Sequence, residues 1–153
     1  MIDLTGSWQG HYEQNGGRHG ISMVVAQRGS SFVGRMRDAH TLIAGTEKLD
    51  ASVPGFFGKA TTVEVVHSLP EESDIEGSVE GSAVQFVKRY RGKATSMWVA
   101  GGSSLHNESA DHRVIYRGLL DESGSLLRGE WRIVSNDSGH PDLVDSFELR
   151  RAP

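Results

Sequence analysis

The sequence contains no cysteine. Disulfides, thiolate metal ligands and cysteine nucleophiles are therefore excluded, and a reducing compartment is favoured. The chain also lacks an apolar stretch long enough to cross a membrane, and its first residues, MIDLTGSW, lack the basic segment and apolar run of a signal peptide. We expect a cytoplasmic protein that makes no membrane contact.

An excess of positive charge is also missing, since 16 Lys and Arg residues face 20 Asp and Glu residues. Without a basic excess the chain has no general attraction to nucleic acid, so we expect no nucleic-acid partner. Walker and Rossmann glycine loops and the Gly-x-Ser-x-Gly elbow are absent from the sequence, and its histidines have no standard metal spacing. We therefore expect no cofactor and no metal.

Glycine is abundant, with 19 glycines against four prolines. Between the glycines lie short segments in which apolar and polar residues alternate, and this period of two predicts β-strands. Asn15-Gly16 and the run DESG at 121–124 are turn signals. Many short strands joined by tight turns predict a single all-β domain over residues 1–153. We expect an antiparallel up-and-down barrel of roughly 8–10 strands, with a two-sheet sandwich as the alternative.

The segment VQFVKRYRG, residues 84–92, indicates where any chemistry would lie. Because an isolated buried charge is costly, the faces that carry most charges must lie outside the barrel. By the resulting alternation Lys88 points inward, together with Tyr90. Asp38 is the best inner carboxylate to pair with Lys88. The alternative is a lysine at the rim, with its stem packed and its ammonium in water.

Aromatic and polar side chains share the predicted interior with this lysine, as in many small-molecule sites. The candidate ligand-binding residues are Lys88, Tyr90, His112, Tyr116, Tyr12, Phe86, Trp131, Met23 and Met36. We predict a barrel that holds a small, partly apolar molecule in its interior, with an anion as one option. The alternatives are an isomerase- or cyclase-type enzyme that uses the same Lys, Tyr and His, and an interaction protein whose barrel is filled by side chains.

The opening segment GSW, Gly6 to Trp8, resembles the Gly-x-Trp strand of the calycins, the superfamily of lipocalins, fatty-acid-binding proteins and avidins. The resemblance implies that Trp8 closes one end of the barrel and that Arg151 of the last strand lies across it. VQFVKRYRG, HRVIYRG and GEWRI are similar to a largely uncharacterised family of small bacterial β-barrel proteins. That likeness implies a barrel and no particular activity.

Two segments are longer than that pattern, residues 39–73 and 93–111. For the runs TTVEVVHS and TSMWVAGG within them, the simplest prediction is extra strands that complete the sheet; a lid and a subunit contact are the alternatives. Phe56, Phe57, Met97 and Trp98 would make the rim unusually apolar for a monomer. We therefore expect a homodimer.

Overall fold

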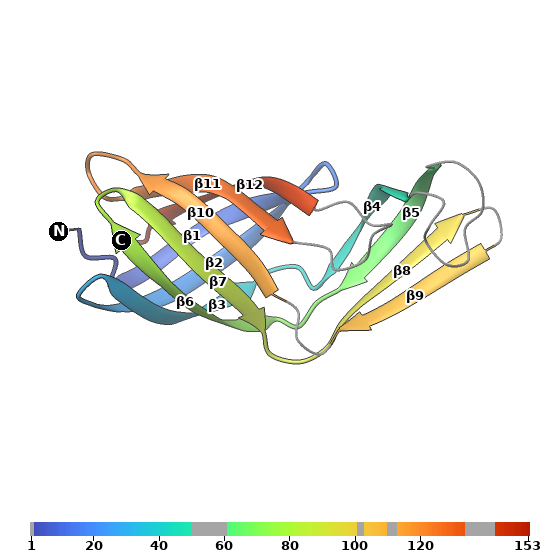
Figure 1. The fold of residues 1–153 in the computed structure, drawn as a ribbon, viewed down its shortest axis with the longest axis horizontal. Coiled ribbons are helices and arrows are strands. Elements are labelled where there is room, and N and C mark those ends of the chain that lie inside the picture. The colour runs from blue at the N-terminus through green and yellow to red at the C-terminus, as the bar shows by residue number, and fades with distance from the viewer. Residues whose placement is uncertain (1, 50–60, 101–102, 110–112, 134–142) are drawn as a thin grey trace.

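The computed structural model describes residues 2–49, 61–100, 103–109, 113–133 and 143–153 (Figure 1). Within these ranges the chain forms twelve strands and no helix, so none of the described residues belongs to a helix that could cross a membrane. The strands are β1 (Gly6–Gln14), β2 (Gly17–Arg28), β3 (Ser31–Asp38), β4 (Leu42–Leu49), β5 (Thr61–Ser68), β6 (Glu72–Glu80), β7 (Ala83–Tyr90), β8 (Ala94–Ala100), β9 (Ser103–Ser109), β10 (Arg113–Leu120), β11 (Leu126–Ile133) and β12 (Leu143–Arg151).

Eight of these strands close into a barrel, in the order β1-β12-β11-β10-β7-β6-β3-β2. Each strand pairs antiparallel with both neighbours, and β1 closes the barrel against β12. If β4, β5, β8 and β9 are set aside, the barrel strands follow one another around the wall in chain order. The prediction of an all-β, up-and-down antiparallel barrel is confirmed.

The hairpin between β1 and β2 shows how the local sequence sets the register. Asn15 and Gly16 both have positive φ, 52° and 77°. A two-residue turn with this backbone matches the twist of a hairpin, and Asn-Gly favours it because Asn and Gly tolerate positive φ best. The turn pairs Gln14 with Gly17, and therefore Tyr12 with His19 further along the two strands.

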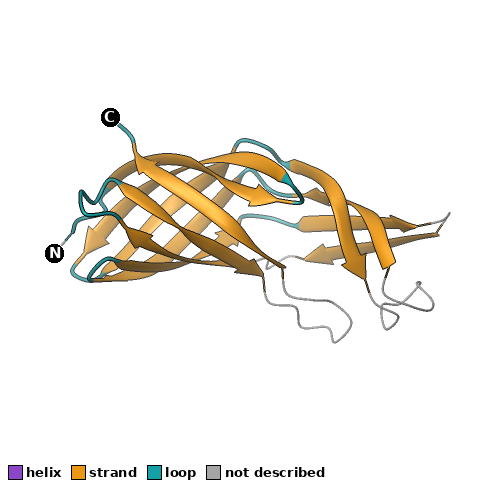
Figure 2. Ribbon diagram, turned by 90° about the horizontal axis from the view of Figure 1, so that it is seen from above, coloured by secondary structure: helices purple, strands orange, loops and turns teal. Residues whose placement is uncertain are grey.

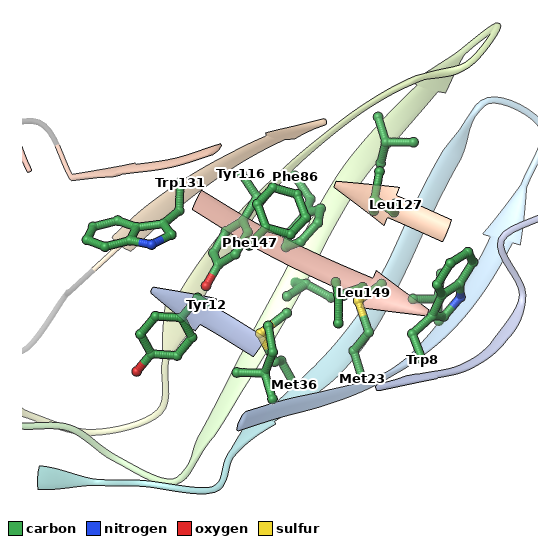
Figure 3. Close-up of a cluster of buried hydrophobic side chains, with 14 of the residues drawn as sticks. Trp8, Tyr12, Met23, Met36, Phe86, Tyr116, Leu127, Trp131, Phe147 and Leu149 are labelled. Atoms are coloured by element: carbon green, nitrogen blue, oxygen red, sulfur yellow. The ribbon is translucent and has the colours of Figure 1, made fainter. Parts of the chain in front are cut away.

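Along each barrel strand, every second side chain points into the barrel, and the side chains between them face solvent. The interior runs from Trp8 at one end to Tyr12 and Trp131 at the other, with the rings of Phe86, Tyr116 and Phe147 between them (Figure 3). Two of these rings, Phe86 and Tyr116, are stacked with centroids 4.7 Å apart. The described interior is thus packed with side chains over much of its length.

Glycine lets the wall curve tightly around this filling. Gly129 in β11 belongs to the inward alternation, and a Cβ there would collide with the carbonyl oxygen of Arg117 on the neighbouring strand. Close approach of two backbones at a bend is a common role of glycine within strands.

Trp8 and Arg151 close one end of the barrel, which we call the closed end. The Trp8 side chain is fully buried, and its indole N–H donates to the Leu4 carbonyl at 2.9 Å. The guanidinium carbon of Arg151 lies 4.6 Å from the centre of the Trp8 ring. The predicted contact between the first and last strands is confirmed.

The strands β4, β5, β8 and β9 form a second sheet, the extension sheet, which continues from the other end of the barrel (Figures 1 and 2). Its order, β4-β5-β8-β9, repeats the order of the barrel strands β3-β6-β7-β10. Backbone bonds bridge one junction, from the Leu69 amide to the Thr41 carbonyl and from the Asp38 amide to the Glu71 carbonyl. TTVEVVHS and TSMWVAGG therefore do contain strands, but the prediction that these complete the barrel sheet is wrong.

The two faces of the extension sheet differ in burial. Ile43, Val65 and Trp98 are buried on one face, whereas Val66 and Met97 on the other are more than a third exposed. The expectation of an exposed Trp98 is wrong, because the alternation of β8 turns its indole to the buried face. Phe56 and Phe57 lie outside the described residues.

Candidate functional site

A buried ion pair lies at the end of the barrel from which the extension sheet continues. We call this end the mouth. The Lys88 ammonium is 2.6 Å from Asp38 Oδ1, and the two side chains are 0% and 1% exposed. The Tyr90 hydroxyl donates to Asp38 Oδ2 at 2.9 Å. The sequence-based predictions that Lys88 points inward and pairs with Asp38 are confirmed, and the alternative of a rim lysine in water is wrong.

The wall of the barrel explains how these groups meet. Asp38 ends β3 and Tyr90 ends β7, and β6 runs between these two strands. Ser73 of β6 is the register partner of Tyr90, and its small side chain is fully buried. A residue as small as serine leaves room inside the wall for Lys88 and Tyr90 to reach the carboxylate across it.

Three tyrosine rings surround the ammonium group. Lys88 Nζ lies 4.6 Å from the centre of the Tyr90 ring, 5.3 Å from that of Tyr12 and 6.0 Å from that of Tyr116. Aromatic faces attract a cation within about 6 Å, and the attraction grows when water is excluded. These rings and Asp38 together replace part of the hydration that the buried ammonium has lost.

Burial shifts the acid–base behaviour of the cluster. Desolvation lowers the pKa of Lys88, although the Asp38 carboxylate opposes this change. Desolvation also raises the pKa of Tyr12, Tyr90 and Tyr116, and the negative charge of Asp38 raises each of them further. All three hydroxyls therefore stay protonated at neutral pH, where they act as hydrogen-bond donors rather than as bases.

Three buried polar atoms at the mouth make no hydrogen bond of ordinary geometry to the residues that the structure describes. They are the Tyr12 hydroxyl, Asn15 Nδ2 and His19 Nδ1. All three belong to the β1–β2 hairpin, and Tyr12 and His19 are register partners whose rings are 5.2 Å apart. Because buried polar groups are nearly always hydrogen-bonded, three exceptions on one hairpin call for an explanation.

Asn15 and His19 were not predicted as site residues. A signal was present in the sequence, because His19 lies in phase with Ile21 and Met23 on the inward alternation of its strand. The two-residue turn then places His19 beside Tyr12. Asn15 offered no separate signal, since its role in the turn already accounted for it.

The predicted ligand-binding residues fall into two groups. Lys88, Tyr90, Tyr12 and Tyr116 lie together, and Trp131 joins them with its ring 6.3 Å from that of Tyr12, edge to face. The other group lies deeper. Phe86 packs in the ring stack, Met36 is a core residue beside Ser73, and Met23 is the register partner of Trp8 near the closed end. His112 lies outside the described residues.

A second polar pair lies on the buried face of the extension sheet. His67 Nδ1 and Ser96 Oγ are 2.6 Å apart, and the His67 ring meets that of Trp98 edge to face at 6.2 Å. No group of three or more His, Asp or Glu side chains that could hold a metal ion occurs among the described residues.

The chain was compared with protein-family models, with curated proteins and with solved structures, and no match was found in any of the three.

Proposed function

We propose that this protein binds a small, partly apolar molecule at the mouth of its barrel, without catalysing a reaction. The observation that carries the proposal is the set of unpartnered polar atoms on the β1–β2 hairpin, Tyr12 Oη, Asn15 Nδ2 and His19 Nδ1. Leaving such groups unpaired costs about 1–3 kcal/mol each. A ligand that hydrogen-bonds to them recovers this cost on binding.

The ring stack argues for the mouth rather than the depth of the barrel as the ligand position. Tyr116 packs between Phe86 and Phe147 at centroid distances of 4.7 and 4.9 Å. Tyr12 and Trp131 lie on the side of this stack that faces away from Trp8, to the left in Figure 3. In the proposed arrangement the stack is the floor of the site, and Tyr12 and Trp131 supply its apolar wall.

The protonation state of the buried tyrosines and the burial of the Lys88–Asp38 pair favour binding over catalysis. The raised pKa of each tyrosine makes these groups poor bases at neutral pH, and both charges of the Lys88–Asp38 pair are buried. General acid–base catalysis works best with groups whose pKa lies near the working pH and that reach the substrate. The ion pair instead fixes the shape of the mouth.

The calycin resemblance belongs to this proposal. It is supported by the eight-stranded up-and-down barrel and by the contact between Trp8 and Arg151 at the closed end. Barrels of about eight strands can hold one small ligand.

Native mass spectrometry of freshly purified protein tests the function. We expect a fraction of molecules to carry an additional mass that disappears under denaturing conditions. This fraction should fall in Tyr12→Phe and stay unchanged in Val24→Thr, a matched control on the outer face of β2, where Val24 is 60% exposed. A bare chain mass in wild-type protein, or equal occupancy in Tyr12→Phe, would contradict the proposal.

An interaction protein is the second candidate, and the same filled interior favours it. Ala44, Val66 and Met97 form a row across β4, β5 and β8 on the exposed face of the extension sheet. Light scattering tests the expected homodimer, and a monomer mass at micromolar concentration would count against self-association through this face.

A further inference from the structure

Whether each unpartnered atom at the mouth donates or accepts a hydrogen bond indicates what kind of ligand group would satisfy it. His19 Nε2 lies 3.4 Å from the Gln14 carbonyl oxygen. A carbonyl oxygen only accepts, so Nε2 can bond to it only as a donor. In the imidazole tautomer that has its hydrogen on Nε2, Nδ1 is an acceptor.

Asn15 contributes a hydrogen-bond donor. Its Nδ2 atom carries two hydrogens and can only donate. The side chain lies against the backbone of β4, where a Cβ added to Gly45 would be 3.1 Å from Nδ2. With His19 in this tautomer, the mouth offers the Asn15 donor and the His19 acceptor, and the Tyr12 hydroxyl can serve as either.

Two of the cations at this end are paired with carboxylates. Lys88 is neutralised by Asp38, and Arg18 at the hairpin is paired with Glu13 at 2.9 Å. Asp145, half-buried on the inward alternation of β12, adds a further carboxylate near Trp131, its register partner. Lys88 and Arg18 are both paired, so neither is available to an anionic ligand.

Aromatic rings lie around Tyr12 and His19. The rings of Tyr12 and His19 are tilted by 35° to each other, while Trp131 meets Tyr12 and His40 meets His19 nearly at right angles. Aromatic walls of this kind favour a flat apolar body, which can stack on one ring and meet the edge of another.

We infer that the mouth recognises a flat, neutral group that both donates and accepts hydrogen bonds, such as a primary or cyclic amide. The inference rests on the proposed function and names its ligand class. The amide oxygen accepts from Asn15 Nδ2, its N–H donates to His19 Nδ1, and the Tyr12 hydroxyl bonds to the remaining lone pair of the oxygen.

Three probes with one ring and different head groups test the inference: benzamide, benzoate and benzamidinium. Benzamide donates and accepts, benzoate only accepts and is negative, and benzamidinium only donates and is positive. Each is titrated into ¹⁵N-labelled protein, and the signals of the Asn15 side-chain amide and the Trp131 indole N–H are followed. We expect both signals to shift with benzamide, with a Kd at least about tenfold below those of the other probes, because each unmatched head group leaves a buried partner unpaired.

Asn15→Asp sharpens the test, because it exchanges a donor for an acceptor at nearly constant shape. Aspartate tolerates the positive φ of this position, 52°, so the turn is retained. We expect the preference to reverse, with benzamidinium binding more tightly than benzamide. Tyr12→Phe should weaken benzamide at least about tenfold. Val24→Thr serves as the control and should change no affinity; the amide spectrum of each variant verifies its fold.

The possible failures are distinguishable. Benzoate binding more tightly than benzamide at the same signals would overturn the ligand class while leaving the proposed function standing. Absence of shifts with all three probes would also overturn the class, and would indicate that these atoms are satisfied by water alone. If native mass spectrometry finds no bound species in addition, the proposed function falls with it.

Discussion

The two ends of the barrel are built from the same eight strands but treat their polar groups in opposite ways. At the closed end the Arg151 guanidinium stacks on Trp8 and donates to the carbonyl oxygens of Asp3, Thr5 and Gly124. The Trp8 indole N–H is bonded to Leu4. At this end the side-chain N–H groups of Trp8 and Arg151 therefore donate to backbone carbonyl oxygens, and these bonds hold the first residues of the chain against the last strand.

At the mouth, by contrast, charged and polar groups are buried inside the barrel. It buries a lysine and a carboxylate, and it leaves Tyr12, Asn15 and His19 each with an unpaired polar atom. Unpaired buried groups lower stability and are retained where something else requires them. Under the proposed function, the closed end serves the fold and the mouth serves recognition. The following predictions test this division from the largest expected effect to the smallest.

Trp8→Ala should have the largest effect, a loss at the upper end of about 3–5 kcal/mol in the free energy of unfolding. The side chain is fully buried, and Arg151 would lose its aromatic partner with it. Denaturant unfolding measures the loss, with Val24→Ala on the outer face as the control, expected to stay within about 0.5 kcal/mol. A loss below about 1 kcal/mol for Trp8→Ala would mean that this end does not carry the fold.

Lys88→Met should cost about 3 kcal/mol, because it leaves the Asp38 carboxylate buried without its cation. The remaining hydrogen bond from Tyr90 keeps the loss at the lower end of the usual range. The double variant Lys88→Met/Asp38→Leu should recover most of that loss, because apolar residues of similar volume often replace a buried ion pair without penalty. Additive losses in the double-mutant cycle would show that the two residues do not act as a pair.

Alkaline pH should destabilise the protein through its tyrosines. The folded state raises the pKa of Tyr12, Tyr90 and Tyr116, the only tyrosines in the chain, so above about pH 10 the unfolded chain loses protons that the folded one keeps. Stability therefore falls as pH rises. The lowered pKa of Lys88 opposes this trend, because there the unfolded chain holds the extra proton. We expect a net loss of about 2–3 kcal/mol between pH 9 and 11.

Near-ultraviolet absorbance of tyrosinate measures the same property directly. The native protein should show no tyrosine ionisation near the usual pKa of about 10, and all three groups should ionise together when the chain unfolds. A phenolate signal that grows near pH 10 while the fold persists would show that at least one of the rings is open to water.

How much of this could be predicted differs between the barrel and the extension sheet. In the barrel, the alternation of side chains predicted that Lys88 points inward. It also predicted its partner, because Asp38 is a carboxylate on the inward alternation of its own strand. The extension sheet could not be predicted in the same way, because a period of two identifies a strand and its faces but not its neighbour in the sheet. β5 leads into β6 and β8 follows β7, so the pairing of β6 with β7 places β5 beside β8. Alternation alone does not reveal that β5 pairs with β8 and not with β6, the next strand in the chain.

The smallest effect should come from Tyr12→Phe, and a second tyrosine provides the matched comparison. The Tyr12 hydroxyl is buried and makes no hydrogen bond of ordinary geometry to the described residues, so its removal should change the free energy of unfolding by less than about 1 kcal/mol. Tyr90→Phe removes a hydrogen bond to the charged Asp38 and should cost about 1.5–3 kcal/mol. Both rings remain in place in the two variants, so only the hydroxyl groups are compared. Equal losses would mean that Tyr12 is already satisfied in the free protein, and the mouth would then lose the feature that distinguishes it from the closed end.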